Sequence, residues 1–225
     1  MSITGADDSA LMLRSLAIFF FAAICVGQTN PAFREVQDVP GLPRVLLIGD
    51  SISIGYTEPV RVELTNKANV HRIPENGAAT VVGVKNLDKW LGTLKWDVIH
   101  FNFGLHDLRL DDGKHQVPLP DYETNLRTIV QRLQKTGARL IWATTTPVPD
   151  ADVKPPRRSA DVIAYNAAAA RIMTESGIPI DDLYELIKPR LGELQLPANV
   201  HYTLPGYNVL GHQVAESVLR ALDLH

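Results

Sequence analysis

The sequence predicts an α/β fold, a three-layer α/β/α sandwich in which helices cover both faces of a parallel sheet. Short apolar runs alternate with amphipathic segments along the chain, which is the order typical of βαβ units. The central runs are apolar over their whole length, as strands buried on both faces are. With 225 residues and no internal repeats, the chain suffices for one sizeable core.

The first 27 residues are predicted to lie outside this domain. The apolar run from Leu16 to Val26 follows Arg14 and has the length of a signal-peptide core, which is too short to span a bilayer. We therefore expect residues 1–27 to be a signal peptide and the protein to be exported, periplasmic or secreted, without stable membrane insertion of the mature chain. The alternative is a buried or interfacial helix, because Asp7 and Asp8 make the segment before the apolar run less basic than the start of a usual signal peptide.

The one cysteine, Cys25, falls within the predicted signal peptide. A mature protein cut near Gly27 would therefore form no disulfide. A lipid-anchored cysteine is a lesser alternative, because Ile24 suits the position before a lipoprotein cleavage site poorly. Residues 28–43 are polar, contain prolines and lack periodicity, so we expect a linker there and a catalytic domain over residues 44–225.

The first half of the domain contains two predicted strands and two predicted helices. Val45 to Ile48 is a short apolar run that stops at a glycine and two small polar residues, which predicts a buried strand and a turn. A first helix follows and ends within residues 60–66. Val70 to Ile73 predicts the second strand. A turn over residues 74–79 precedes a helix that runs to about Leu91.

The second half continues the alternation. Trp96 to Phe103 is bulky and β-branched at its centre, as expected of a buried parallel strand. Leu140 to Thr145 and Ile178 to Ile180 predict two more strands, and an Ala-rich helix is expected over about residues 159–176. Two further helices have apolar faces at helical spacing: Tyr122, Leu126, Ile129, Val130 and Leu133 in one, and Tyr207, Leu210, Val214, Val218 and Leu222 in the last. Five strands in the flavodoxin-like order are the expected topology.

The turn after the first strand carries a candidate nucleophile. Ser51 would lie at the carboxyl edge of the sheet, where open α/β folds bind ligands, and the next helix would direct its free N–H groups at an anion formed there. The alternative is that Asp50 or Ser51 only caps that helix. Acyl transfer by a serine also needs a base, and His201, just before the last helix, would lie at the same edge.

These segments resemble the SGNH, or GDSL-like, hydrolases. Gly49-Asp50-Ser51 after a strand is similar to the first block of that family, and residues 104–107, Gly-Leu-His-Asp, are similar to its third block, Gly-x-Asn-Asp. Together with Gly77 after the second strand and His201 before the last helix, they occur in the family's order over most of the predicted mature chain.

The resemblance implies the SGNH hydrolase fold and a serine esterase. It assigns Ser51 as nucleophile, His201 as general base, and the backbone N–H groups of Ser51 and Gly77 as oxyanion donors. His106 stands where the family usually has an asparagine side chain, and a neutral imidazole can donate one N–H in its place. Asp107 is expected to tie down its loop, with a displaced triad acid as the alternative.

The chain departs from the family at the acid. The family usually has an aspartate three residues before the histidine, and here that position is Ala198, followed by Asn199. An amide or a backbone carbonyl can orient an imidazole but does not stabilise the imidazolium as a carboxylate does. Three interpretations stay open: a Ser-His dyad, a carboxylate supplied from elsewhere, or a triad whose acid has been lost or replaced.

Composition restricts the partners. The chain has 22 Lys+Arg against 25 Asp+Glu and no long basic run, so no nucleic-acid partner is expected. The histidines show no metal-ligand spacing, and neither a Gly-x-Gly-x-x-Gly motif nor a P-loop follows any strand. No metal and no cofactor are therefore expected. Arg157 and Arg158 are read as solvated charges, or as contacts to an anionic or polyhydroxyl substrate.

The sequence therefore predicts an enzyme that hydrolyses small acyl esters, with acetyl the expected acyl group. A carbohydrate ester as substrate rests only on export and on analogy of fold. Two alternatives remain. One is a catalytically impaired carbohydrate-binding or scaffold protein on an esterase fold, and the other is an acyltransferase that uses the same Ser51 and His201.

Overall fold

The computed structural model describes residues 30–223, so the signal peptide predicted for residues 1–27 lies outside the described part. Five parallel strands form a sheet in the order β2-β1-β3-β6-β7. The strands are β1 (Arg44–Ile48), β2 (Asn69–Arg72), β3 (Val98–Phe101), β6 (Arg139–Ala143) and β7 (Ile180–Asp181). This is the flavodoxin-like order that the sequence predicts.

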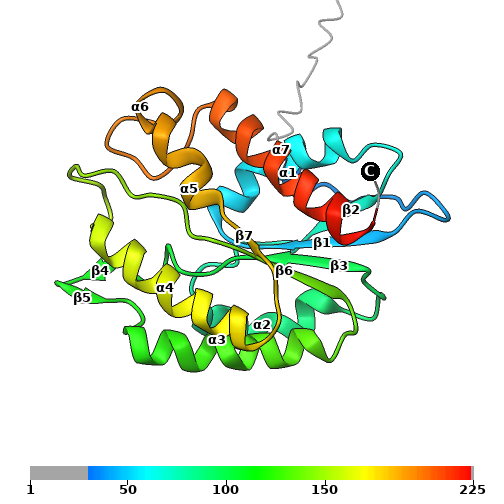
Figure 1. Ribbon diagram of the computed structural model, residues 1–225, viewed down its shortest axis with the longest axis horizontal. Coiled ribbons are helices and arrows are strands. Elements are labelled where there is room, and N and C mark those ends of the chain that lie inside the picture. Colours follow the sequence, from blue (N-terminus) through cyan, green and yellow to red (C-terminus); the bar gives the residue numbers. More distant parts are fainter. Residues whose placement is uncertain (1–29, 224–225) are drawn as a thin grey trace, which may run out of the picture.

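Helices cover both faces of the sheet (Figure 1). On one face lie α1 (Ser51–Glu63) and α7 (Leu204–Ala221), and on the other lie α2 (Thr80–Leu91), α3 (Leu119–Gln134) and α4 (Ser159–Glu175). The apolar faces predicted for α3 and α7 are buried against the sheet, with Tyr122, Leu126, Val214 and Val218 all nearly inaccessible to solvent. The three-layer α/β/α sandwich is thus confirmed.

Several short elements escape the sequence analysis. These are an antiparallel pair, β4 (Leu110–Asp111) and β5 (Lys114–His115), the helices α5 (Leu183–Ile187) and α6 (Leu191–Leu194), and the 3₁₀ turns η1 (Pro31–Phe33) and η2 (Lys188–Arg190). Elements of two to five residues are too short to show a hydrophobic period. They matter for function because the loops that they build surround the carboxyl edge of the sheet.

The close contact between α1 and α7 positions the two helices that flank the candidate site. A Cβ atom at Gly55 of α1 would overlap the ring of Tyr207, and one at Gly211 of α7 would overlap Pro59. Both positions therefore need glycine for the two helices to approach this closely. Because α1 begins at the nucleophile turn, its packing on α7 sets where Ser51 lies.

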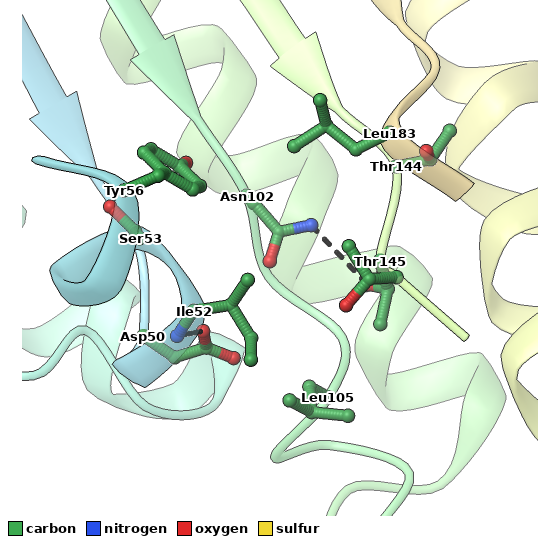
Figure 2. A pocket seen from close by; sticks show the side chains of 10 residues that line it. Asp50, Ile52, Ser53, Tyr56, Asn102, Leu105, Thr144, Thr145 and Leu183 are labelled. Carbon is green, nitrogen blue, oxygen red and sulfur yellow. Dashed lines mark hydrogen bonds between the residues drawn. The ribbon is translucent and has the colours of Figure 1, made fainter. Parts of the chain in front are cut away.

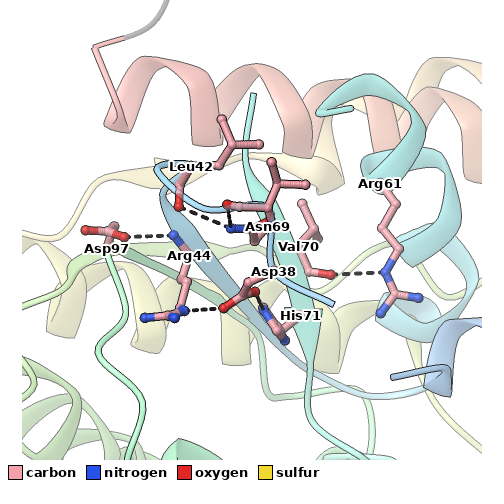
Figure 3. A network of polar contacts seen from close by, with 9 residues as sticks. Asp38, Leu42, Arg44, Arg61, Asn69, Val70, His71 and Asp97 are labelled. Atoms are coloured by element: carbon pink, nitrogen blue, oxygen red, sulfur yellow. Dashed lines mark hydrogen bonds and ion pairs between the residues drawn. The ribbon is translucent and has the colours of Figure 1, made fainter. Parts of the chain in front are cut away.

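Residues 30–43, predicted to be a linker, are packed against the domain. Ala32 is buried, and the side chain of Asn69 on β2 donates to the carbonyl oxygens of Val39 and Leu42. Figure 3 shows Asp38 between Arg44 and His71, with which it forms ion pairs. This segment is thus held along the β2 edge of the sheet rather than extending freely.

Within residues 30–223, no helix combines the length and the hydrophobicity that a bilayer-spanning segment requires.

Candidate active site

The loops after β1, β2 and β3 and the loop before α7 meet at the carboxyl edge of the sheet and form the candidate active site. Ser51 is the first residue of α1, and His201 lies just before α7. The structure brings these two residues together although 150 positions separate them in the chain. Both sequence-predicted candidates for the chemistry therefore occupy one site.

Asp50 and Ser51 have different roles at the start of α1. The Asp50 carboxylate accepts the backbone N–H of Ile52 at 2.9 Å and so caps the helix. The Ser51 hydroxyl instead lies 2.8 Å from Nε2 of His201. The capping role that the sequence allows for either residue thus belongs to Asp50, and the Ser51 side chain is directed at the histidine.

The orientation of His201 is set by Asn199. The Asn199 side-chain oxygen accepts the backbone N–H of His201 at 3.0 Å and lies 2.8 Å from Nδ1 of the same residue. A backbone N–H can only donate, so the group facing it must be the amide oxygen, and Nδ1 must then carry the ring proton. Nε2 is therefore the acceptor, and the Ser51 hydroxyl donates to it.

The position of the family's usual aspartate does not face the imidazole. Ala198 is exposed and has a φ of 48°, in the left-handed region that most side chains avoid. Asn199, one residue closer to His201, makes the contact instead. Of the orienting groups considered from the sequence, Asn199 is the one that hydrogen-bonds to His201, and the exposed Ala198 has no polar side chain to offer.

Gly77 requires a correction. Its N–H, expected to be an oxyanion donor, already donates to the Gly49 carbonyl oxygen at 3.0 Å. A Cβ atom at Gly77 would lie 2.9 Å from the same oxygen, so glycine is needed here for the close approach of two backbones. Within residues 30–223, the N–H groups of Ser51 and Ala79 have no hydrogen-bond acceptor, and they are two of the unpaired backbone donors of these turns.

Arg72, on β2, holds the nucleophile turn and is not among the predicted site residues. It is only 9% exposed. Its Nη2 lies 3.2 Å from the carbonyl oxygen of Gly49 and 3.3 Å from the hydroxyl of Ser53, while Nη1 donates to two carbonyl oxygens of the next loop. The guanidinium therefore ties down the turn on both sides of Ser51. An arginine inside an apolar predicted strand is the signal that could have revealed it.

Asp107 ties its loop to the start of α2, as expected. It is fully buried, and one carboxylate oxygen accepts both the backbone N–H and the hydroxyl of Thr80. Burial raises the pKa of Asp107 to about 6, against the hydrogen bonds from Thr80, which lower it. Because its contacts are to Thr80 rather than to His201, Asp107 is not a displaced member of the triad.

His106 lies half-buried near the catalytic pair. Burial lowers its pKa, the positive charges of Arg157, Arg109 and His201 lower it further, and Asp50 opposes them. The ring is therefore neutral at neutral pH. It forms no hydrogen bond to any residue in the described part of the chain, so its N–H remains available to a ligand.

His201 is also held in the neutral form. Burial is the largest cause that lowers its pKa, and the charge of Arg157 acts in the same direction, while Asp50 raises it. A neutral imidazole that accepts a hydroxyl proton on Nε2 has the protonation state of a general base. The site therefore pairs the Ser51 hydroxyl with a neutral imidazole.

A small pocket lies beside the nucleophile turn. Figure 2 shows Asp50 and Ile52 on one side of it, facing Asn102 and Thr145 across the gap. Leu105 and Leu183 add apolar surface. The pocket has a volume of about 10 Å³, which is room for about one water molecule. Only a small group fits in this pocket.

Other titratable groups lie apart from the site. His100 is fully buried in the core, where its Nε2 lies 3.0 Å from a carboxylate oxygen of Asp181 and its Nδ1 has no hydrogen-bond partner among the described residues. Among residues 30–223, no three histidine, cysteine, aspartate or glutamate side chains lie close enough together to hold a metal ion.

Comparison with known proteins agrees with this geometry. The sequence matches the model of the GDSL-like Lipase/Acylhydrolase family over residues 47–209, which is more than half of the chain. The match includes the turn of Ser51, the loop of His106 and the segment that contains Asn199 and His201. No curated protein sequence gives a significant match.

Solved structures of esterases share the fold. The lipase/acylhydrolase from Enterococcus faecalis superposes with a TM-score of 0.70 at 22% identity, over 82% of this chain and 98% of that one. The acetyl xylan esterase AlAXEase gives a TM-score of 0.67 at 15% identity, over 78% and 99%. Axe2, an acetylxylan esterase from Geobacillus stearothermophilus, gives a TM-score of 0.64 at 20% identity, over 81% of this chain and 95% of that one. At these identities the similarity shows the fold.

Proposed function

The chain belongs to the GDSL-like lipase/acylhydrolase family, and we propose that it is a serine esterase that removes a small acyl group, such as acetyl, from an alcohol. The observation that carries the proposal is the chain of hydrogen bonds from Ser51 through His201 to Asn199. It joins a nucleophile, a base and an orienting group in the geometry that acyl transfer requires.

In the proposed reaction, the Ser51 oxygen attacks the ester carbonyl and His201 takes its proton on Nε2. The imidazolium then donates that proton to the departing alcohol, which leaves an acyl-enzyme. A water molecule, deprotonated by the same imidazole, attacks the acyl-enzyme and releases the acid. The oxyanion of each tetrahedral intermediate would accept hydrogen bonds from the free N–H groups of Ser51 and Ala79 and from the ring of His106.

The size of the pocket supports a short acyl group. The pocket lined by Asp50, Ile52 and Ser53, at the turn that carries Ser51, has room for about one water molecule, which suits a methyl group and not a long chain. Two of the structural neighbours are described as acetyl xylan esterases. On this basis we infer an acetyl ester as substrate, with a carbohydrate as its alcohol, in the exported location that the N-terminal segment predicts.

The test is hydrolysis of p-nitrophenyl acetate by the purified protein, beside a Ser51→Ala variant at matched concentration. We expect turnover in the wild-type protein and none above background in the variant. Equal rates for the two proteins would contradict the proposal.

One observation favours a second function. Asn199 lacks the negative charge that stabilises an imidazolium, and loss of that charge can cost up to about 10⁴ in rate. The site could therefore belong to a binding protein with little catalysis. Absence of turnover, together with binding of an acetylated sugar that Ser51→Ala leaves intact, would favour this second function.

A further inference from the structure

The loop over residues 150–158 places a positive charge at the rim of the candidate site. Nε of Arg157 donates to the Leu105 carbonyl oxygen at 2.8 Å, and Nη1 donates to that of Pro155 at 3.1 Å. The same loop is tied to β4 by a hydrogen bond from Leu110 to Pro156. The guanidinium is thus fixed against the residue that precedes His106.

The contacts that fix Arg157 do not neutralise it. Both of its acceptors are uncharged carbonyl oxygens, and no carboxylate of residues 30–223 lies within ion-pair distance of it. The nearby Arg109, in contrast, forms an ion pair with Asp111 at 2.7 Å. A guanidinium has five N–H donors, so three of them remain free on a side chain that is already held in place.

The charge of Arg157 reaches the reacting groups. It acts on both His106 and His201, and the carboxylates of Asp50 and Asp111 are the opposing charges that act on Arg157. One oxygen of Asp50 caps α1 and the other faces the small pocket without a partner. Arg157 is more accessible than Asp50, so a substrate anion that approached from solvent would meet the cation first.

From this arrangement we infer that Arg157 binds a carboxylate on the alcohol part of the ester, so that the substrate is an acyl ester of an acidic alcohol. The inference rests on the proposed function. The carboxylate is placed on the alcohol because the pocket lined by Asp50, Ile52 and Ser53 has room for only about one water molecule and contains an unpartnered carboxylate oxygen of Asp50. A fixed guanidinium with free N–H groups suits a carboxylate, which it can bind through two parallel hydrogen bonds.

The test compares two acetyl esters of the same shape. In 4-acetoxybenzoate the alcohol part carries a carboxylate, and in 4-acetoxybenzamide it carries a neutral amide. The ratio of their kcat/KM values is measured at pH 8, where His106 and His201 are neutral, for the wild-type protein, Arg157→Gln and Arg158→Gln. Arg158 is the matched control, because it is an exposed arginine next in the chain.

We expect the ratio of acidic to neutral ester to fall about tenfold in Arg157→Gln, as for a hydrogen-bonded charge, and to stay unchanged in Arg158→Gln. Added salt should lower the ratio of the wild-type protein, because it screens the attraction. Arg157→Lys keeps the positive charge but loses the paired guanidinium donors. Its ratio of acidic to neutral ester should lie between those of the wild-type protein and Arg157→Gln. The lysine variant and the salt series suffice if Arg157→Gln does not fold.

The inference is overturned if the wild-type protein hydrolyses the neutral ester but the ratio does not depend on Arg157 or on salt. It is equally overturned if Arg157→Gln lowers kcat/KM only for esters with the carboxylate on the acyl part, such as 4-nitrophenyl hemisuccinate. In both cases the proposed function stands. If neither acetyl ester is turned over above the Ser51→Ala background, the proposed function and the inference fail together.

Discussion

The Asn199 side-chain oxygen receives two hydrogen bonds from a single residue, one from the backbone N–H of His201 and one from its Nδ1. The first bond fixes which end of the amide faces the histidine, and the second then fixes the tautomer. An amide is often a poor substitute for the triad acid because it can present its NH₂ group and select the wrong tautomer. Here the backbone prevents that, so orientation is kept and only the negative charge is missing.

Asn199→Asp should therefore raise activity. A carboxylate can accept the same two hydrogen bonds and also stabilises the imidazolium, so we expect kcat to rise about tenfold or more and the pKa of His201 to rise. The pH dependence of p-nitrophenyl acetate hydrolysis measures both. Ala198→Asp is the control, since Ala198 is exposed and does not contact the ring. An equal gain from Ala198→Asp would show that Asn199 is not the orienting group.

Activity should persist on the acid side of neutrality. His201 acts as a base only when neutral, and burial lowers its pKa below the ordinary value of 6.5. We therefore expect kcat/KM to be flat near pH 7 and to fall only when the pH drops below 6.5. The measurement is a kcat/KM profile from pH 4 to 9, corrected for unfolding at each pH. A midpoint above 6.5 would contradict a neutral, buried base.

His106 should be replaceable by asparagine but not by alanine. If its N–H donates to the oxyanion, His106→Ala should lower kcat by about 10² or more, the usual cost of removing one oxyanion donor, with little change in KM. His106→Asn supplies an amide donor and should retain most of the activity while changing the acid limb of the profile. If His106→Ala keeps the wild-type kcat, His106 does not stabilise the oxyanion.

Asp107 should make stability depend on pH between about 4 and 6. Burial raises its pKa from 3.8 to about 6 in the folded protein, so in this window the folded state binds more protons than the unfolded state. The free energy of unfolding then falls as the pH rises, by on the order of 3 kcal/mol for this group.

Asp107→Asn keeps an oxygen for Thr80 and removes the titration. Urea unfolding at several pH values should show that the variant gains stability over the wild-type protein as the pH rises from 4 to 6. A constant difference would mean that Asp107 does not titrate there.

Arg72→Lys should lower kcat more than it raises KM. A lysine cannot span Gly49, Ser53 and the next loop together, so the turn of Ser51 loosens, and we expect a fall in kcat of about tenfold or more. Arg61→Lys is a matched control. Arg61 has the same 9% exposure but bonds to Val70 and Glu58, away from the turn. A similar loss of kcat in both variants would point to general destabilisation instead.

The sequence by itself determined the fold and the two residues that meet at the candidate site. The apolar runs predict the five strands, their alternation with helices predicts the parallel sheet, and the small missed elements do not change the layers. Ser51 and His201 follow from the same reasoning, because residues at the carboxyl ends of parallel strands share one edge of the sheet. These properties depend on local patterns, which are readable residue by residue.

Only the tertiary structure decided which polar groups in the site are free and which are occupied. The N–H of Gly77 is taken by Gly49, the imidazole meets Asn199 rather than position 198, and Arg157 reaches the site from a loop 52 residues away from Leu105. The contacts of Gly77 and Arg157 require two segments distant in the chain to meet within about 3 Å, and the contact of Asn199 depends on the conformation of the loop before α7. A shift of one residue in a loop changes such a contact and leaves the hydrophobic pattern as it was.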